Sequence, residues 1–395
     1  MQLAIGLKAR HGSDVHAKKN AGMTERNWTH SVSHRFVGLT KGQERQQVSD
    51  ARVSELPGNA PRRTRGASLL LLLCGFGLLI VLCFASLVLG PRMLSPDVLL
   101  QALSGQNRTS AEQIILLDYR LPRTLLGLLC GAAFGVSGAL IQAATRNPLA
   151  DPGILGVNAG SAFFVTLAVG LLGWQSIDTY IWAAFAGAIV MTLIVYALGA
   201  SGKDGATPIR LVLAGVALSA VLGGIGSAMT LLNPQAFDAL RLWSIGSLAG
   251  RDMHVVARVA PFILGGLVIG LLAARPLNAV ALGDDLARSL GADILRARVL
   301  VVIAVTLLAG AGTAACGPIG FVGLMVPHMV RWFTGPDQRR IVAFTLIFSP
   351  ALLLSADIVG RLVLYPGELE AGIVTAFIGA PVLIALARRR KASAL

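Results

Sequence analysis

The chain has 395 residues, of which 54% are hydrophobic and only 14% are charged, and its net charge is +14. Because an average soluble domain carries about 25% charged residues, this composition excludes an ordinary water-soluble protein and indicates a membrane protein. Half of the net charge lies in residues 1–66, where twelve Lys or Arg outnumber five Asp or Glu, and the rest lies mostly in short loops. We therefore expect no nucleic-acid partner.

Residues 1–66 are polar and hold four of the six histidines. The segment lacks the pattern of a secretory signal peptide, so we interpret it as a disordered basic cytoplasmic tail; a start at Met23 is an alternative that would shorten it. The histidines lack the spacing of metal ligands. The four cysteines lie in or beside apolar runs, without zinc or disulfide spacing. We predict no metal and no cofactor.

Nine charge-free runs follow, and several exceed the roughly 20 residues that cross a bilayer. One of them would form a helix about 48 Å long, but Gly317-Pro318 interrupts it, so it should form two spans. The sequence thus predicts an all-α polytopic membrane protein with about ten transmembrane helices in one domain over 67–391. The runs are 67–91, 124–145, 154–177, 179–202, 211–237, 259–274, 299–330, 341–356 and 371–387.

The charges that flank these runs predict the topology. Arginines precede the first span, and Arg388 to Lys391 follow the last, so both termini should be cytoplasmic. Alternation then places 146–152, 203–210, 275–298 and 331–340 inside, and 92–121, 233–253 and 361–369 outside. Glycines spaced four apart predict closely packed helices; they are Gly127, Gly131 and Gly135, and Gly156 and Gly160.

Motifs for catalysis are missing from the sequence. The dipeptide Gly202-Lys203 is followed by Asp204 and does not complete a phosphate-binding loop, so the chain should neither bind ATP by itself nor act as an enzyme. An ion-coupled carrier would place ionisable groups near the membrane midplane. The candidates here, Asp357 and His328, lie toward span ends, where we interpret both as structural.

The expected cytoplasmic loop 275–298 is long and contains an amphipathic helical pattern. Apolar residues interleave with acidic and basic ones, and glycines stand at both ends. We interpret it as a docking surface for a protein, because its acidic pair would be repelled by anionic headgroups; an interfacial helix on lipid is the alternative. The residues concerned are Gly283, Asp284, Ala287, Arg288, Leu290 and Gly291.

Three arginines stand at the expected outer mouth of the bundle. Arg120 and Arg123 lie at the start of one span, and Arg361 lies between two late spans, near Glu368. Exposed arginines there suit an acidic protein partner. Internal ion pairs or interface anchors explain the charges equally well.

Several long stretches resemble the iron-siderophore and vitamin B12 permease family of binding-protein-dependent ABC importers. They are RLPRTLLGLLCGAAFGVSGALIQAATRNPLADPGILGVNAG (120–160), RLVLAGVALSAV (210–221), ALGDDLARSLGA (281–292), GPIGFVGLMVPHMVR (317–331), and PALLLSADIVGR with PGELEAGIVTAFIGAPVLIALARR (350–389). The resemblance covers about 68–390 and, within the family, is closest to ferric-enterobactin permease subunits.

This resemblance implies a ten-helix subunit with the fold of the vitamin B12 permease, in a bacterial inner membrane. It would pair with a like or sister subunit, dock two cytoplasmic ATPase subunits, and receive its cargo from a periplasmic siderophore-binding protein. The expected cargo is a ferric siderophore of the catecholate, enterobactin-like type. An ion-coupled secondary transporter of a small metal complex is the alternative.

The resemblance also assigns roles to single residues. Arg120, Arg123 and Arg361 match arginines that pair with acidic residues of the binding protein, and the segment from Gly283 to Gly291 matches the helix that seats in the ATPase. Gate positions are matched by Asn147 and Leu149. The second gate element departs from the vitamin B12 permease, because Pro208-Ile209 replaces small hydroxyl residues.

Overall fold

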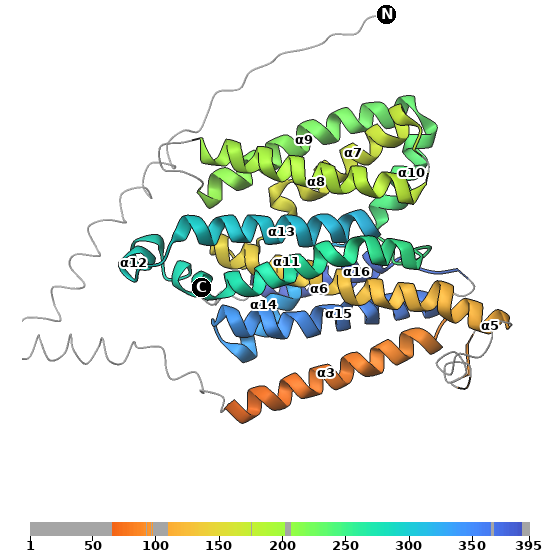
Figure 1. Ribbon diagram of the computed structural model, residues 1–395, viewed down its shortest axis with the longest axis horizontal. Coiled ribbons are helices and arrows are strands. Elements are labelled where there is room, and N and C mark those ends of the chain that lie inside the picture. Colours follow the sequence, from red (N-terminus) through yellow and green to blue (C-terminus); the bar gives the residue numbers. More distant parts are fainter. Residues whose placement is uncertain are drawn as a thin grey trace, which may run out of the picture. The chain divides into compact units, whose positions relative to one another are not determined.

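All regular secondary structure in the described part of the chain is helical. The computed structural model describes residues 65–91, 93–95, 97, 110–174, 176–201, 207–364 and 367–388, and no strand occurs among them. The predicted tail and the alternative start at Met23 lie outside these residues, except that Arg65 and Gly66 begin the first helix. The elements (Figure 1) are α3 (Arg65–Val88), α5 (Ala111–Ile114), the π-helix η1 (Ile115–Arg120), α6 (Leu121–Thr145), the 3-10 helix η2 (Pro152–Leu155), α7 (Val157–Leu172), α8 (Ile177–Ala200), α9 (Pro208–Leu232), α10 (Pro234–Ile245), α11 (Met253–Val280), α12 (Asp284–Ser289), α13 (Ile294–Cys316), α14 (Val322–Thr334), α15 (Gln338–Val363) and α16 (Ala371–Arg388).

Each of the ten expected spans contains a helix of its own. Seven helical segments in the described residues are long and apolar enough to cross a membrane, and the shorter α7 and α16 are apolar as well. The tenth is α14. The prediction of a polytopic all-α membrane protein is confirmed.

The predicted interruption at Gly317-Pro318 is confirmed. Helix α13 ends at Cys316, and Gly317 has a φ of 76°, a conformation that residues with a side chain rarely adopt. A Cβ atom at this position would lie 2.1 Å from the carbonyl oxygen of Trp243, so a side chain is excluded by space as well. The chain then begins α14 at Val322.

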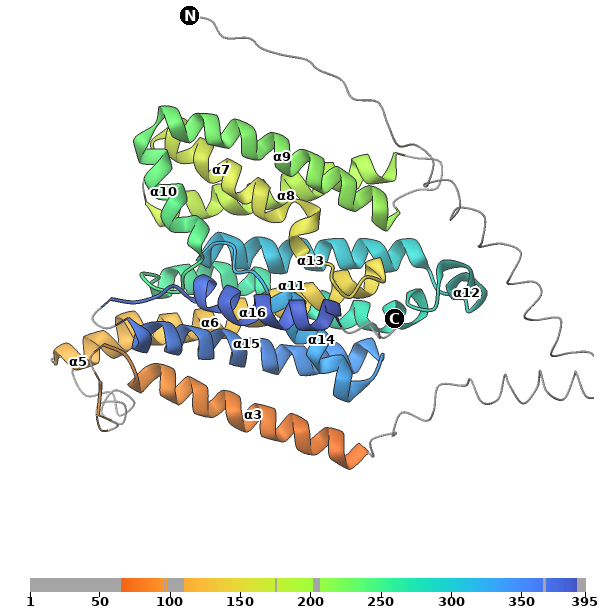
Figure 2. The same ribbon diagram turned by 180° about the vertical axis from the view of Figure 1, so that it is seen from behind.

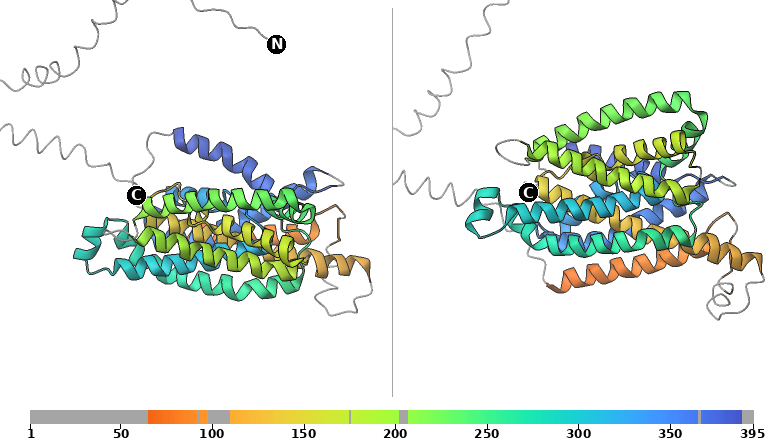
Figure 3. Two further views of the ribbon diagram at one scale, coloured as in Figure 1. Left: turned by 90° about the horizontal axis from the view of Figure 1, so that it is seen from above. Right: turned by 45° about the horizontal axis from the view of Figure 1, so that its top comes forward.

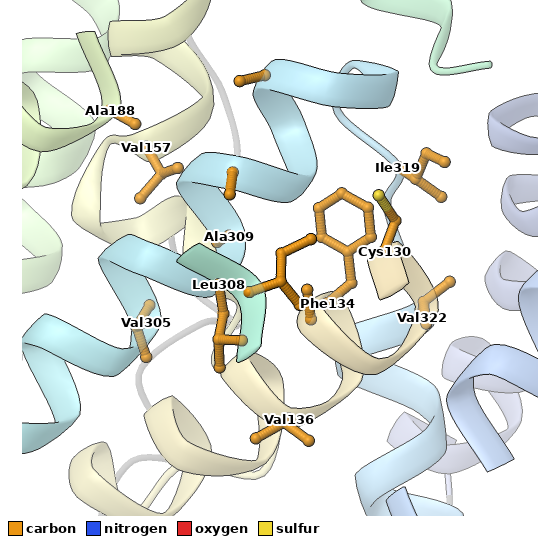
Figure 4. Packing of buried hydrophobic residues seen from close by; sticks show 14 of the residues in the cluster. Cys130, Phe134, Val136, Val157, Ala188, Val305, Leu308, Ala309, Ile319 and Val322 are labelled. Carbon is orange, nitrogen blue, oxygen red and sulfur yellow. The ribbon is translucent and has the colours of Figure 1, made fainter. Parts of the chain in front are cut away.

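Helix α6 is the centre of the bundle. It continues α5 and η1 without a break and contacts α11, α13, α14 and α15. Figure 4 shows Cys130, Phe134 and Val136 of this helix among apolar side chains of the neighbouring helices. Leu126 and Leu140 are fully buried. A residue on α6 is therefore connected by direct packing to α11, α13, α14 and α15.

Close packing at the spaced glycines is also confirmed. A Cβ atom on Gly131 would lie 2.5 Å from Cα of Pro350 in α15, and one on Gly160 would lie 2.3 Å from the carbonyl oxygen of Gly187 in α8. Such backbone approach is open only to glycine. A further contact of this kind joins α6 to α14, where Gly138 faces the backbone of Gly323.

Helices α3 and α9 are the least buried of the seven long segments. Only 11% of the most apolar stretch of each is covered within the chain. In Figures 2 and 3, α9 lies with α7, α8 and α10, while α16 runs obliquely along one edge of the bundle. Helix α10 was not anticipated, because 233–253 was expected to be a loop; Pro234 at its first turn and the side chain of Asn233, which accepts from the Ala236 N–H, begin it.

The bundle has two ends that differ in structure. Helix α12 projects at one end and α5 at the other (Figures 1 and 2). We refer to these as the α12 end and the α5 end. The predicted docking arginines lie at the α5 end, whereas the predicted coupling and gate residues lie at the α12 end.

Candidate functional site

At the α5 end, two arginines bind the last carbonyl groups of α3. Arg120 is only 6% exposed, and its Nη1 donates to the carbonyl oxygens of Leu87 (2.8 Å) and Val88 (2.6 Å). Arg361 is 2% exposed and donates through Nη1 to the carbonyl oxygen of Ser86 (2.8 Å). The last carbonyls of a helix lack partners within the helix and carry partial negative charge. The two guanidinium groups satisfy them and fix α3 to α6 and α15.

A buried carboxylate lies between Arg361 and Arg123. Asp357 is fully buried, and Arg123 donates to it from Nε (3.0 Å) and Nη2 (2.8 Å), while Arg361 donates to it from one turn later in α15. Arg123 also donates from Nη1 to Glu368 at 2.7 Å. Glu368 is 31% exposed and belongs to the segment before α16. This network, Arg120, Arg123, Asp357, Arg361 and Glu368, is called the arginine cluster below.

The arginine cluster corrects one expectation. The three arginines were expected to be exposed, but two are buried and the side chain of Arg123 is 11% exposed. They are buried because the helix ends and Asp357 supply acceptors inside the bundle. The interpretation of Asp357 as structural agrees with this geometry, and the docking role stays a prediction.

At the α12 end, the predicted amphipathic helix is present as α12. The flanking parts of the expected loop, 275–280 and 294–298, belong to α11 and α13. Gly283 and Gly291, which were expected at its ends, have φ values of 107° and 77°. Ala287 is fully buried, whereas Leu286 and Leu290 are 49% and 62% exposed. An exposed apolar face on a short projecting helix is suited to a protein partner.

The first residue of α12 is held by two arginines from other helices. Asp284 accepts from Nη2 of Arg146 at 2.9 Å and from Nη2 of Arg298 at 2.8 Å. Arg288, which was expected in the same surface, is exposed, and its Nη1 lies 3.5 Å from a carboxylate oxygen of Asp285. Thus only the first of the two adjacent aspartates ties α12 to the bundle through these pairs.

The predicted gate residues also lie at this end. The side chain of Asn147 accepts a hydrogen bond from the N–H of Leu149 at 3.0 Å, which closes a tight turn after α6, and Leu149 is 51% exposed. Pro208 is the first residue of α9, a position that needs no N–H donor. Ile209 beside it is 73% exposed. Burial raises the pKa of Asp151, which caps η2 directly after this turn.

The chain matches a known protein family over most of its length. Residues 78–389 match the FecCD transport family. The chain belongs to the FecCD transport family. One relative is the ferric enterobactin transport system permease protein FepD of Escherichia coli (strain K12), which is 50% identical over 318 residues, 80% of this chain and 94% of that protein. Another is the Fe(3+)-citrate import system permease protein YfmD of Bacillus subtilis (strain 168), which is 41% identical over 71% of this chain and 83% of that protein.

A solved structure extends the family assignment to the fold. A metal-chelate type ABC transporter in an inward-facing conformation matches 80% of this chain and 98% of its own chain, with a TM-score of 0.71 and 27% identity. The predicted ABC importer fold is confirmed. This member of the FecCD transport family is accordingly a multi-pass membrane permease rather than an enzyme.

Sequence reasoning missed several residues that hold these sites together. Gln142 of α6 is fully buried, and its Nε2 donates to the carbonyl oxygen of Gly323 at 3.0 Å. Arg146 and Arg298 were not singled out, although both bind Asp284. A single sequence contains no pattern that predicts the pairing of Arg146 with Asp284, because the two residues are 138 positions apart.

Proposed function

We propose that the chain is the membrane-spanning subunit of a binding-protein-dependent ABC importer that carries a ferric siderophore across the bacterial inner membrane. The observation that carries this proposal is the 50% identity to a ferric enterobactin permease, which extends over 94% of that protein. It favours a catecholate cargo, because the similarity to the Fe(3+)-citrate permease is lower, at 41%. The N- and C-termini and the α12 end are cytoplasmic in this proposal, and the α5 end is periplasmic.

The described side chains support the proposal that another subunit supplies the energy for transport. The buried acid of the arginine cluster, Asp357, is held by two arginines, so its charge is compensated and it offers no open site for a transported ion. Helix α12 with exposed Leu286 and Leu290 is the surface that we assign to a cytoplasmic ATPase subunit. Two such subunits would drive the complex. An ion-coupled carrier would have no use for this surface.

An apolar groove supports passage of a bulky cargo. It lies between the end of α10 and one face of α16, has a volume of about 590 Å³, and is lined mainly by small and apolar residues. Phe377 on its rim is 78% exposed. We assign this groove to one wall of the translocation path, where a large chelate would meet few charges that could retain it. Its lining residues are Ile245, Gly372, Ile373, Ala376, Phe377, Ala380 and Pro381.

A second permease subunit is the partner that we assign to the exposed face of α9. Gly223 and Gly224 on this helix have open space where a side chain would stand, so another helix can approach closely. A Gly224→Cys substitution in a variant without the four native cysteines tests this contact between like subunits: a disulfide-linked dimer supports it, and a lack of cross-linking in a complex of two copies of this chain contradicts it.

For docking at the α5 end, we propose that a periplasmic binding protein competes for the arginine cluster. Arg123 already binds Glu368, which is partly exposed, so a carboxylate of the partner can replace Glu368 without leaving a buried charge unpaired. Arg120 and Arg361 donate hydrogen bonds to carbonyl groups of α3, so in this proposal they stabilise the docking site without binding the partner.

The experiment is cargo competition in iron-starved cells that lack their own ferric enterobactin permease and express this chain with its partner subunits. Uptake of ⁵⁵Fe-enterobactin is measured against excess unlabelled ferric citrate or ferric hydroxamate, and uptake of the ⁵⁵Fe-labelled citrate and hydroxamate complexes is measured separately. Uptake that only catecholate chelates suppress supports the proposal. Suppression by the citrate or hydroxamate complex would contradict the catecholate assignment, and no uptake of any chelate would contradict the transport function.

A further inference from the structure

Besides the buried Ala287, three charged side chains from three elements connect α12 to the rest of the bundle. Asp284 begins α12, Arg146 ends α6, and Arg298 lies in the first turns of α13. The two N–O distances are 2.9 and 2.8 Å. The side chains are 26%, 35% and 20% exposed, so the group lies at the surface of the bundle without being freely solvated. We call it the Asp284 link.

The covalent connections of α12 are poorly suited to fix its orientation. Gly283 precedes the helix and Gly291 follows it after one further residue, and both have positive φ. No atom lies close to the position that a side chain on Gly291 would occupy. At Gly283 the nearest atom to such a position is Nη1 of Arg146, at 3.6 Å. Glycine tolerates a wide range of backbone conformations at both junctions. The Asp284 link therefore adds side-chain contacts to the backbone hydrogen bonds at the two junctions of α12, from Gly283 N–H to Val280 (3.1 Å) and from Ala292 N–H to Ala287 (2.9 Å).

Arg146 lies directly before the predicted gate residues, so a displacement of Arg146 would also displace them. It adopts a left-handed conformation with a φ of 51°, and its N–H donates to carbonyl groups of the last turn of α6. The next four residues form the turn that holds Asn147 and Leu149. A movement of α12 would thus be transmitted through Asp284 to the residue at which α6 turns into the gate.

The same route continues into the bundle through Gln142, one turn before Arg146. Its Nε2 donates to the carbonyl oxygens of Gly323 (3.0 Å) and Leu324 (3.3 Å) at the start of α14. Gly138, a further turn back, packs directly on the backbone of Gly323. The C-terminal turns of α6 are therefore in direct backbone contact with the start of α14.

We propose that Asp284, bound by Arg146 and Arg298, is the positioning residue that transmits movement of α12 to the gate turn at 147–150. The proposal rests on the proposed function, since it assumes that an ATPase subunit moves α12. It predicts that variants without the Asp284 link still bind the ATPase subunit and hydrolyse ATP, but transport less iron. Partly exposed ion pairs contribute little to net stability, so the variants should fold.

The test uses the complete transporter, with its ATPase and binding protein, in proteoliposomes supplied with ⁵⁵Fe-enterobactin. ATP hydrolysis and iron uptake are measured on the same preparation, and their ratio is compared between variants. Asp284→Asn should lower the iron carried per ATP by about fivefold or more, the low end of the range that coupling between two sites spans. Arg146→Gln should do the same, and the double variant should lose no more than either single one.

Two controls separate the link from general effects of charge. Asp238→Asn makes the same change in an exposed pair within one helix, the pair with Arg241 of α10, and should leave the ratio unchanged. Asp178→Asn removes a comparably exposed ion pair between helices, the one with Arg258 at the α5 end, and should also leave it unchanged.

The outcomes are distinct. An unchanged ratio in Asp284→Asn, an equal loss in Asp238→Asn, or a failure of Asp284→Asn to retain the ATPase subunit during purification would each overturn the proposal. If the unaltered chain itself fails to bind an ATPase subunit, the proposed function fails instead. Additive losses in Arg146→Gln and Asp284→Asn would show that the two residues act separately and would also overturn it.

Discussion

The buried carboxylate of the arginine cluster gives the sharpest prediction about stability. Asp357 is fully buried and accepts hydrogen bonds from Arg123 and Arg361, the second of which is itself 2% exposed. In Asp357→Ala, two guanidinium groups would remain next to each other without this acid. Removing one partner of a buried ion pair typically costs about 3–5 kcal/mol.

The remaining contacts place the expected cost at the low end of that range. Arg361 keeps the carbonyl oxygen and hydroxyl of Ser86, and Arg123 keeps Glu368. We therefore expect a loss of about 3 kcal/mol. At about 2 °C per kcal/mol for a chain of this size, the melting temperature should fall by about 6 °C.

The assay is thermal unfolding of the detergent-solubilised protein, followed by the loss of the monodisperse peak on size-exclusion chromatography. Glu368→Gln is the matched control, because it removes one partly exposed acid from the same cluster and should lower the melting temperature much less. If Asp357→Ala melts within about 1 °C of the unaltered chain, a shift that corresponds to well under 1 kcal/mol, or if Glu368→Gln is equally destabilised, the buried network does not hold the α5 end together.

Three further predictions concern packing, pH and membrane levels. Gly138→Ala should destabilise the bundle by about 1–3 kcal/mol in the same melting assay, because the new Cβ would lie 2.0 Å from the carbonyl oxygen of Gly323; Gly77→Ala, in open space on α3, should not. Asp151→Asn should raise the melting temperature more at pH 7.5 than at pH 5. Burial raises the pKa of Asp151, so the protonated form stabilises the fold at low pH and this contribution is lost as the pH rises through the folded-state pKa. Arg361→Glu should reduce the amount of folded protein in the membrane, measured by quantitative blotting, because it places a second acid beside Asp357; normal levels would contradict the structural role of this arginine.

The features that the sequence predicted correctly are those that depend on local pattern. The apolar runs, the interruption at Gly317-Pro318 and the amphipathic α12 are each set by residues adjacent in the chain. The close approach at Gly131 also follows from spacing along one helix, although the spacing does not identify the partner helix.

The features that sequence reasoning missed depend on which helix ends meet. Arg120 and Arg361 were expected to be exposed because they flank apolar runs, and only the position of the α3 carboxyl end provides them with buried acceptors. Helix α10 was missed because its polar residues resemble those of a loop. The Asp284 link joins residues from three separate segments, and a single sequence contains no signal for such a set.

The most direct test of the central claim is iron uptake by purified chain in proteoliposomes, with ⁵⁵Fe-enterobactin outside and either ATP inside or an imposed proton gradient. We predict accumulation only when the ATPase and binding-protein partners are present together with ATP. Accumulation by the chain alone along a proton gradient would contradict the account and would identify an ion-coupled carrier instead.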